Sequence, residues 1–371
     1  MSTIKVDGIR SNSASSDAIT LASDGTCTAN IINNLSNRNK VINGAMAVHQ
    51  RDTSVTGITA SGYRTADRMD LSLTNGGTWT NTISTDTPDG FADSYKLDCT
   101  TADTSLSGSD KVLFRTILEG QDLQDFAKGT SSAKKFTVSF YIKTNKTGTY
   151  VLELYDNSNS RHASKTYTVS NTNWNRYTLS FPADTTGAFA NSNAAALYMH
   201  FWLAAGPDYT GGTTQTSWGS QTNGNRAHGL NVNIADSTSN EWLITGIQLE
   251  VDHTGSGVAT DFEHRSYGQE LVLCQRYFQA LSLHGLAASQ TPYDSSYRCY
   301  VPFKQTMRAI PTITYPSISN FQPGGATGTA SGANATVDGV LVNTGSNNTN
   351  SNYIPNWVND TSAIMKASAE L

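Results

Sequence analysis

The sequence predicts an all-β protein: an antiparallel jelly-roll β-sandwich, a short helical clasp and a smaller C-terminal β domain, preceded by a short N-terminal attachment segment. Three observations predict this class. Apolar and polar residues alternate with period two in many short runs, which gives a strand one buried and one solvated face. Turn-forming residues separate these runs roughly every 8–15 residues. Only 15% of the 371 residues are charged, which suits dense strands joined by tight turns.

Residues 1–37 are interpreted as the attachment and trimerisation segment. Two short strand-like pieces, Ile4–Val6 and Ala18–Leu21, flank a turn-rich run of Ser, Asn and Ala. Strands of this length are too short to bury a face on their own. The segment is therefore expected to become ordered by pairing with another chain or by docking on the body of its own chain.

Residues 38–265 are assigned to the β-sandwich, because the period-two runs concentrate there. The clearest runs are Arg68–Leu73, Lys135–Lys143, Tyr150–Tyr155, Tyr177–Phe181, Leu197–Leu203 and Trp242–Val251. In the last of these runs, Gln248 and Glu250 are expected on the solvated face. One helical turn is expected at Gln121–Lys128, as a crossover at the sheet edge.

The clasp is predicted within residues 260–279, the one stretch with a short helical pattern. Ser266 is a predicted N-cap, and Gln269 three residues later completes a capping box. Four residues then recur at spacings of four, three and four, which places them on one helical face: Tyr267, Leu271, Cys274 and Phe278. Glu263 and Arg265 are expected to form an ion pair. The predicted interdomain clasp thus comprises Glu263, Arg265, Leu271, Cys274 and Phe278.

Residues 266–371 contain the predicted C-terminal β domain, with strands near Tyr297–Phe303, Ile313–Tyr315 and Thr336–Val342. Two low-complexity tracts interrupt it, at residues 323–335 and 343–352. They are interpreted either as flexible loops or as a variable tip that contacts a ligand or partner.

Composition narrows the possible partners and compartments. A net charge of −5 argues against nucleic acid, since phosphate binding needs clustered Lys and Arg. The sequence contains no run of 18 apolar residues, so no membrane span is predicted. The N-terminus lacks the pattern of a signal peptide. The four cysteines are far apart, without a CxxC pair, which favours free buried thiols. These features indicate a protein made in a cytoplasm and able to function outside it.

No enzyme signature is present, so no catalytic residue is predicted. The sequence lacks GxSxG, GxxxxGK[ST] and HExxH. Glu263 and His264 are adjacent, so in a strand they face opposite sides, and a structural ion pair is preferred to a catalytic dyad. No cofactor is predicted. Glu153 and Asp156 flank a strand end, where their carboxylates either are solvated or help to bind a structural Ca²⁺ ion.

Aromatic residues suggest a binding role instead. The flat face of a sugar stacks on exposed aromatic rings, while amides and hydroxyls bond its hydroxyl groups. The candidates for such a platform are Trp79, Trp202, Tyr209 and Trp218, with Tyr155 beside them. Trp174 and Trp242 are assigned to the core. The alternative for every candidate is buried packing, the usual role of aromatic residues in a sandwich.

Four blocks of sequence resemble a family of phage tail-fibre and appendage proteins from phages of marine bacteria and cyanobacteria. They are RNKVINGAMAVHQR at 38–51, YRTADRM at 63–69, ITGIQLE at 244–250 and ATDFEHRSYGQELVLCQRYFQ at 259–279. The likeness spans about residues 38–320, and the middle of the chain is similar to the jelly rolls of carbohydrate-binding modules.

This resemblance implies a structural virion protein, a homotrimer assembled in the host cytoplasm and located on the tail. It implies partners among the other tail or capsid proteins, through the N-terminal segment, and a host-surface glycan as ligand. A capsid decoration protein, or head fibre, with the same fold is an alternative. A tail polysaccharide depolymerase is disfavoured, because the sequence lacks the repeat period of a β-helix.

Overall fold

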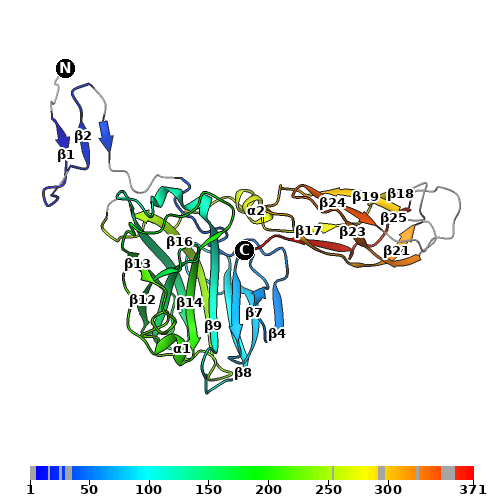
Figure 1. The fold of residues 1–371 in the computed structure, drawn as a ribbon, viewed down its shortest axis with the longest axis horizontal. Helices are drawn as coiled ribbons and strands as arrows, with labels where there is room; N and C mark the ends of the chain where they lie inside the picture. The colour runs from blue at the N-terminus through cyan, green and yellow to red at the C-terminus, as the bar shows by residue number, and fades with distance from the viewer. Residues whose placement is uncertain are drawn as a thin grey trace.

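Two antiparallel sheets form the body of the molecule, and a narrower β domain projects from one end of them, with helix α2 between the two (Figure 1). The computed structural model describes residues 6–15, 17–24, 27–29, 36–252, 255–290, 297–322, 326–343 and 356–371. Within these residues no helix is long and apolar enough to cross a membrane.

The sandwich consists of a six-stranded and a seven-stranded sheet. The first has the order β13-β10-β16-β8-β7-β4, with β4 at Ser54–Ile58, β7 at Thr78–Ser84, β8 at Ser94–Thr101, β10 at Lys135–Thr144, β13 at Asn175–Phe181 and β16 at Glu241–Asp252. The second has the order β15-β12-β11-β14-β9-β6-β5, with β5 at Gly62–Tyr63, β6 at Asp70–Thr74, β9 at Lys111–Glu119, β11 at Gly148–Asp156, β12 at Arg161–Val169, β14 at Ala195–Ala205 and β15 at Gly219–Ser220. The predicted all-β, jelly-roll class is confirmed.

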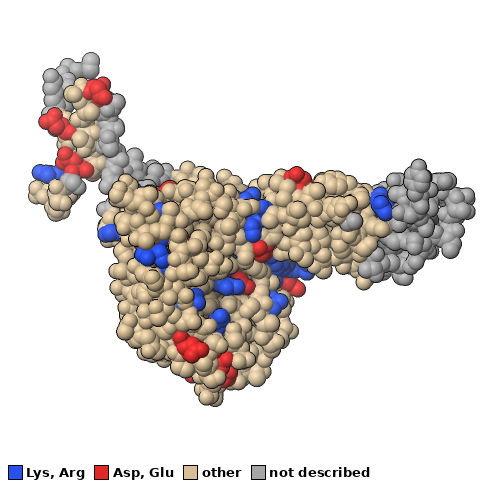
Figure 2. Space-filling view, in the orientation of Figure 1, with Lys and Arg blue, Asp and Glu red and all other residues tan. Residues whose placement is uncertain are grey.

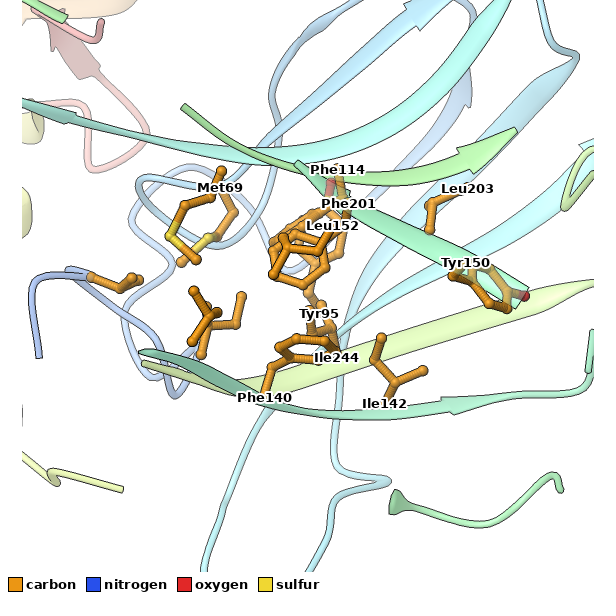
Figure 3. Close-up of a cluster of buried hydrophobic side chains, with 14 of the residues drawn as sticks. Met69, Tyr95, Phe114, Phe140, Ile142, Tyr150, Leu152, Phe201, Leu203 and Ile244 are labelled. Atoms are coloured by element: carbon orange, nitrogen blue, oxygen red, sulfur yellow. The ribbon is translucent and has the colours of Figure 1, made fainter. Parts of the chain in front are cut away.

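The core lies between these sheets and contains the residues that the alternation predicted (Figure 3). On β10, Phe136, Val138, Phe140 and Ile142 are completely buried. The Phe140 ring meets Phe201 of the opposite sheet edge to face, with ring centroids 5.0 Å apart. The predicted helical turn is a 3₁₀ helix, η1, at Gly120–Phe126, and it places Phe126 against Phe136 in this core.

Strand β16 departs from the predicted alternation, because both of its faces are covered. Gln248 is completely buried and Glu250 is 3% exposed, so their assignment to a solvated face was wrong. The cover comes from residues that follow the strand: Thr260 bonds to the Glu250 carboxylate, and Glu263 N donates to Gln248 Oε1. The segment at residues 39–44 pairs along the edge of β16 beyond the end of β8, where Lys40 N donates to Leu249 O and Ile247 N donates to Gly44 O.

Helix α2, at Tyr267–Gln275, begins with the predicted capping box of Ser266 and Gln269. Its predicted apolar face is wrong. Tyr267 is 61% exposed, whereas Glu270 and Cys274 are buried, and Leu271 is half-buried. Phe278 is buried but belongs to strand β17. The buried Glu270 has polar partners: Asn43 N donates to its carboxylate, and Arg265 pairs with it.

The C-terminal domain has its own hydrophobic core, which includes Leu283, Val340, Val342 and Met365. Its three-stranded sheet has the order β17-β26-β20, from Phe278–Ser282, Ile364–Ser368 and Thr312–Thr314. Its seven-stranded sheet has the order β22-β21-β25-β18-β19-β24-β23, from Ala326–Thr329, Ser317–Gln322, Asn356–Val358, Ala287–Gln290, Tyr297–Pro302, Gly339–Asn343 and Ser331–Ala333.

The first low-complexity tract is not a plain loop, because β22 and β23 lie within it. Its residues 323–325, and all but the first residue of the tract at 343–352, lie outside the described residues. At the other end of the chain, β1 at Gly8–Ile9, β2 at Ile19–Leu21 and β3 at Cys27–Ala29 form a three-stranded sheet with one another. The N-terminal strands are thus ordered by mutual pairing, which the sequence did not predict.

Candidate functional site

The sequence blocks that resemble appendage proteins meet at the end of the sandwich next to the C-terminal domain. Asn39 connects the first block to the third: its Oδ1 accepts from the backbone nitrogens of Val41 and Leu249, and its Nδ2 donates to Ile247 O at 3.1 Å. Gly44 is required beside this contact, because a Cβ there would lie 2.1 Å from Ile247 O.

The fourth block closes over β16 through polar side chains. Glu250 accepts from the backbone nitrogen and hydroxyl of Thr260 at 2.9 and 2.7 Å, and Arg38 lies 3.7 Å from its carboxylate. Gln248 Oε1 accepts from Glu263 N at 2.8 Å. Buried polar groups are tolerated only when they are bonded, and these bonds satisfy Gln248 and Glu250 in place of water.

The predicted Glu263–Arg265 ion pair is not formed. The Glu263 carboxylate instead accepts from the backbone nitrogens of Asn37 and Asn39. Arg265 donates to the carbonyls of Asn39 and Val41 and pairs with Glu270, Nη1 to Oε1, at 3.3 Å. Both side chains also bond to the backbone of residues 37–41, so the clasp fastens that distant segment as well as its own helix.

Four charged side chains, here called the four-charge network, connect the sandwich to the C-terminal domain: Arg51, Asp67, Arg68 and Glu370. Arg51 lies between the two acids, with Nη1 3.0 Å from Asp67 Oδ1 and Nη2 2.7 Å from Glu370 Oε1. Arg68 pairs with the other oxygen of Glu370. All four side chains are 9% exposed or less, so their charges are compensated within the protein.

Aromatic rings of the clasp complete this network. The guanidinium carbon of Arg68 lies 3.5 Å from the centre of the Tyr277 ring, and that of Arg51 lies 3.7 Å from the centre of the Phe278 ring. Burial raises the pKa of Asp67 to about 6, although Arg51 and a hydrogen bond from Gln50 lower it in part. Cys274, also buried at this junction, has a pKa raised well above its usual value by burial.

A second polar cluster lies on the outer face of the seven-stranded sheet, around Glu153. Its carboxylate accepts from His200 Nδ1 at 2.8 Å, from Arg226 Nε at 2.8 Å and from Trp202 Nε1 at 3.1 Å, and His162 Nδ1 lies 3.1 Å away. Burial alone would raise the pKa of Glu153, but Arg226 and the two histidines hold it well below its usual value. Burial lowers the pKa of His200 to about 4.

The suggested calcium ligands do not share a site. Glu153 is bonded to arginine, histidine and tryptophan, which are donors rather than calcium ligands. Asp156 pairs with the buried Lys128 at 2.6 Å and accepts from Asn159. Residues three apart on a strand face opposite sides of the sheet. Among the described residues, no three or more His, Cys, Asp or Glu side chains are grouped to hold a metal ion.

The predicted tryptophan platform is not formed either. Trp79 and Trp202 are completely buried, and Tyr209 is 8% exposed with its ring centroid 4.9 Å from that of Trp202. Trp218 is half-buried, packs on Phe136 and donates to Pro182 O. The three buried rings offer no face to a sugar, whereas the half-buried Trp218 stays a prediction.

The chain segment 206–231 explains the cover on Trp202, because it crosses the outer face of the seven-stranded sheet, whereas Trp79 is buried in the core between the sheets. It is fixed by bonds from Ala227 N to Tyr209 O and from Asn231 N to Thr149 O. Tyr155 and Tyr198 remain half-buried beside it, with ring centroids 5.9 Å apart. Trp242 is buried as predicted, whereas Trp174 is only half-buried.

A hollow of about 190 Å³ lies over the outer face of the six-stranded sheet, next to the start of α2. We call it the aromatic pocket and define it by Ala47, Ala92, Phe91, Phe262, His264 and Glu270, which are among its lining residues. Phe91 and Phe262 meet edge to face with ring centroids 5.1 Å apart. Sequence reasoning noted His264 only as a rejected catalytic residue and did not detect the two phenylalanines.

Comparison with known proteins gives distant structural likenesses. No protein-family model and no curated protein sequence matches the chain. Among solved structures, the enzymatically active domain of bacteriophage CBA120 tailspike protein 4 gives a TM-score of 0.30 at 12% identity, over 58% of this chain and 21% of that one. The chain therefore matches about a fifth of that tailspike domain.

Carbohydrate-binding modules are also among the similar structures. The family 11 module of the Clostridium thermocellum cellulase Lic26A-Cel5E gives a TM-score of 0.27 at 11% identity, over 57% of this chain and 99% of the module. TmCBM61, solved with β-1,4-galactotriose, gives 0.28 at 7% identity, over 58% and 99%. Because all of these TM-scores are below 0.5, the assignment of the fold rests on the strand topology described above.

Proposed function

We propose that the chain is a structural protein of a phage virion, a tail-fibre or appendage subunit that attaches the particle to the host surface by binding glycans. One observation supports this most directly. The motif blocks that resemble appendage proteins, separated by up to about 200 residues, form one buried network at the sandwich end. The resemblance therefore follows a structural unit and not a set of unrelated short matches.

The form of the molecule suits this role. The C-terminal domain projects from the sandwich, away from the N-terminal strands (Figure 1), so one end is available for the particle and the other for the host. The N-terminal segment exposes Val6, Ile9 and Leu21, at 39% or more, which favours burial against a partner chain. Most of the face in Figure 2 carries neither Lys and Arg nor Asp and Glu, as expected for side-by-side packing of subunits.

We further propose that the protein binds sugars without cleaving them. Glycoside hydrolysis needs two carboxyl groups that flank the scissile bond. The buried Glu153 accepts from two histidines, an arginine and a tryptophan, and the buried Glu270 pairs with Arg265. Both carboxylates have internal structural partners.

Two measurements test this function. Light scattering of the purified chain at micromolar concentration should give the mass of a trimer, and a stable monomer would contradict the appendage model. A glycan array should show binding to a subset of bacterial surface glycans, without release of reducing ends. Steady release of reducing sugar would instead support a depolymerase.

A further inference from the structure

We propose that the aromatic pocket is the binding site for one pyranose ring of a neutral glycan. The proposal rests on the proposed function for the biological source of the sugar, but on the pocket's own geometry for the kind of ligand. The pocket lies on the outer face of the six-stranded sheet, so it is separate from Trp79, which is buried in the core between the sheets, and from Trp202 and Trp218, which the seven-stranded sheet and the segment after it carry.

The shape of the pocket fits a single sugar ring. Its volume is about 190 Å³, smaller than the roughly 300–1,000 Å³ typical of sites for drug-sized ligands. Small side chains, including Ala47 and Ala92, leave the space open, and Phe91 and Phe262 provide the apolar surface. One side of a pyranose ring is a patch of C–H groups that packs on an aromatic ring, while its rim consists of hydroxyls that need polar partners.

The aromatic wall is held in place before any ligand binds. Thr245 Oγ1 donates to Asp93 O at 2.8 Å, and Thr87 Oγ1 donates to Phe91 O at 2.8 Å, so the loop of Phe91 is bonded at both ends. Gly246, at φ +63°, provides the floor on which Phe91 rests, because a Cβ there would lie 2.7 Å from that ring. A site formed in advance avoids the entropy cost of ordering its side chains.

The polar groups of the pocket favour a neutral ligand. Arg265 and Glu270 both line it and pair with each other, so their charges cancel. Glu270 Oε1 accepts from Asn43 N, while Oε2 has Arg265 at 3.5 Å, which leaves Oε2 with capacity for a sugar hydroxyl. His264 and Tyr267 are exposed at the rim. An anionic sugar would have to compete with Glu270 for Arg265.

The test is saturation-transfer NMR on the full chain with methyl pyranosides of glucose, galactose, mannose and N-acetylglucosamine, and with N-acetylneuraminic acid as the charged comparison. At least one neutral pyranoside should receive saturation, and the acidic sugar should not. Two variants follow: Ala92→Trp fills the hollow from an exposed position, and Phe262→Ala removes one aromatic wall. Each should weaken binding by about tenfold or more.

Controls separate the pocket from folding and from the wider function. Ala60→Trp, at an exposed loop position, is matched to Ala92→Trp and should leave binding unchanged, and circular dichroism melting checks that every variant is folded. The proposal is overturned if no neutral pyranoside receives saturation, or if both pocket variants bind as the wild type does. If both variants still bind the glycan array as the wild type does, the pocket is not the sugar site, but the proposed function stands. Pyranoside binding lost in the variants, with no binding on the array or to host cells, would support the pocket and contradict the function.

Discussion

Replacing Glu370 by Gln should destabilise the protein severely, because Glu370 is the shared anion of two buried arginines. Its side chain is 7% exposed, and those of Arg51 and Arg68 are 9% and 2% exposed. The substitution preserves size, removes the charge and replaces one of the two acceptor oxygens by an NH2 donor. The network would then hold two guanidinium groups and a single carboxylate, that of Asp67.

The magnitude follows from the cost of an uncompensated buried charge. Removing one partner of a buried ion pair costs about 3–5 kcal/mol. Two pairs share Glu370, but they are coupled and do not add, so we expect a loss of at least about 3 kcal/mol. Stacking of the arginines on Tyr277 and Phe278 persists in the variant and limits the loss.

Urea unfolding followed by tryptophan fluorescence measures this loss, since five of the six tryptophans lie between residues 79 and 242 and report on the sandwich. The matched control is Asp98→Asn, which breaks a pair with Lys96 whose side chains are 34% and 26% exposed. Exposed pairs contribute about 0–1 kcal/mol. If both variants lose the same small amount, the four-charge network does not stabilise the junction and the reasoning is wrong.

Three further predictions follow from single residues. The pKa of Asp67 is about 6 in the folded protein and 3.8 for the ordinary group. Between pH 3.8 and about pH 6, the folded state therefore holds a proton on Asp67 that the unfolded state has lost. Its contribution to the free energy of unfolding should therefore decrease as pH rises through that window, by about 3 kcal/mol; urea titrations at pH 4 and pH 7 should show this difference, and Asp67→Asn should abolish it. Gly44→Ala should cost more than about 1–3 kcal/mol, because its Cβ meets Ile247 O; a melting temperature equal to that of the wild type would show that the segment 39–44 is not held against β16. Trp202→Ala should cost about 3–5 kcal/mol while leaving glycan affinity unchanged at a temperature where the variant is folded, and a selective loss of affinity there would restore Trp202 as a ligand residue.

The features that sequence predicted are those set by local pattern. The alternation in β10 identified Phe136, Val138, Phe140 and Ile142 as core, because alternate side chains of a strand face the same side of the sheet. The capping box at Ser266 was found because its two partners are three residues apart. The cover on Gln248 and Glu250 was missed, since alternation within a strand does not show that residues 10–15 positions later fold back over it.

The candidate site was harder to predict than the fold. Residue type identified Trp79 and Trp202 as aromatic but gave no indication of their burial. The Glu263–Arg265 pair was inferred from nearness in sequence, whereas the actual partner of Arg265 is Glu270 and that of Arg68 is Glu370, about 300 positions away. Arg51, Asp67 and Arg68 all lie in the motif blocks at 38–51 and 63–69, but nothing in those blocks indicates that their charges are buried together.

The location of the chain on a particle tests the central claim most directly. Phage particles labelled with a gold-conjugated antibody against the chain, viewed by electron microscopy, should carry gold at the tail appendages. Gold distributed over the head lattice would instead indicate a capsid decoration protein. Purified particles without gold, from a phage whose genome encodes the chain, would contradict a virion role altogether.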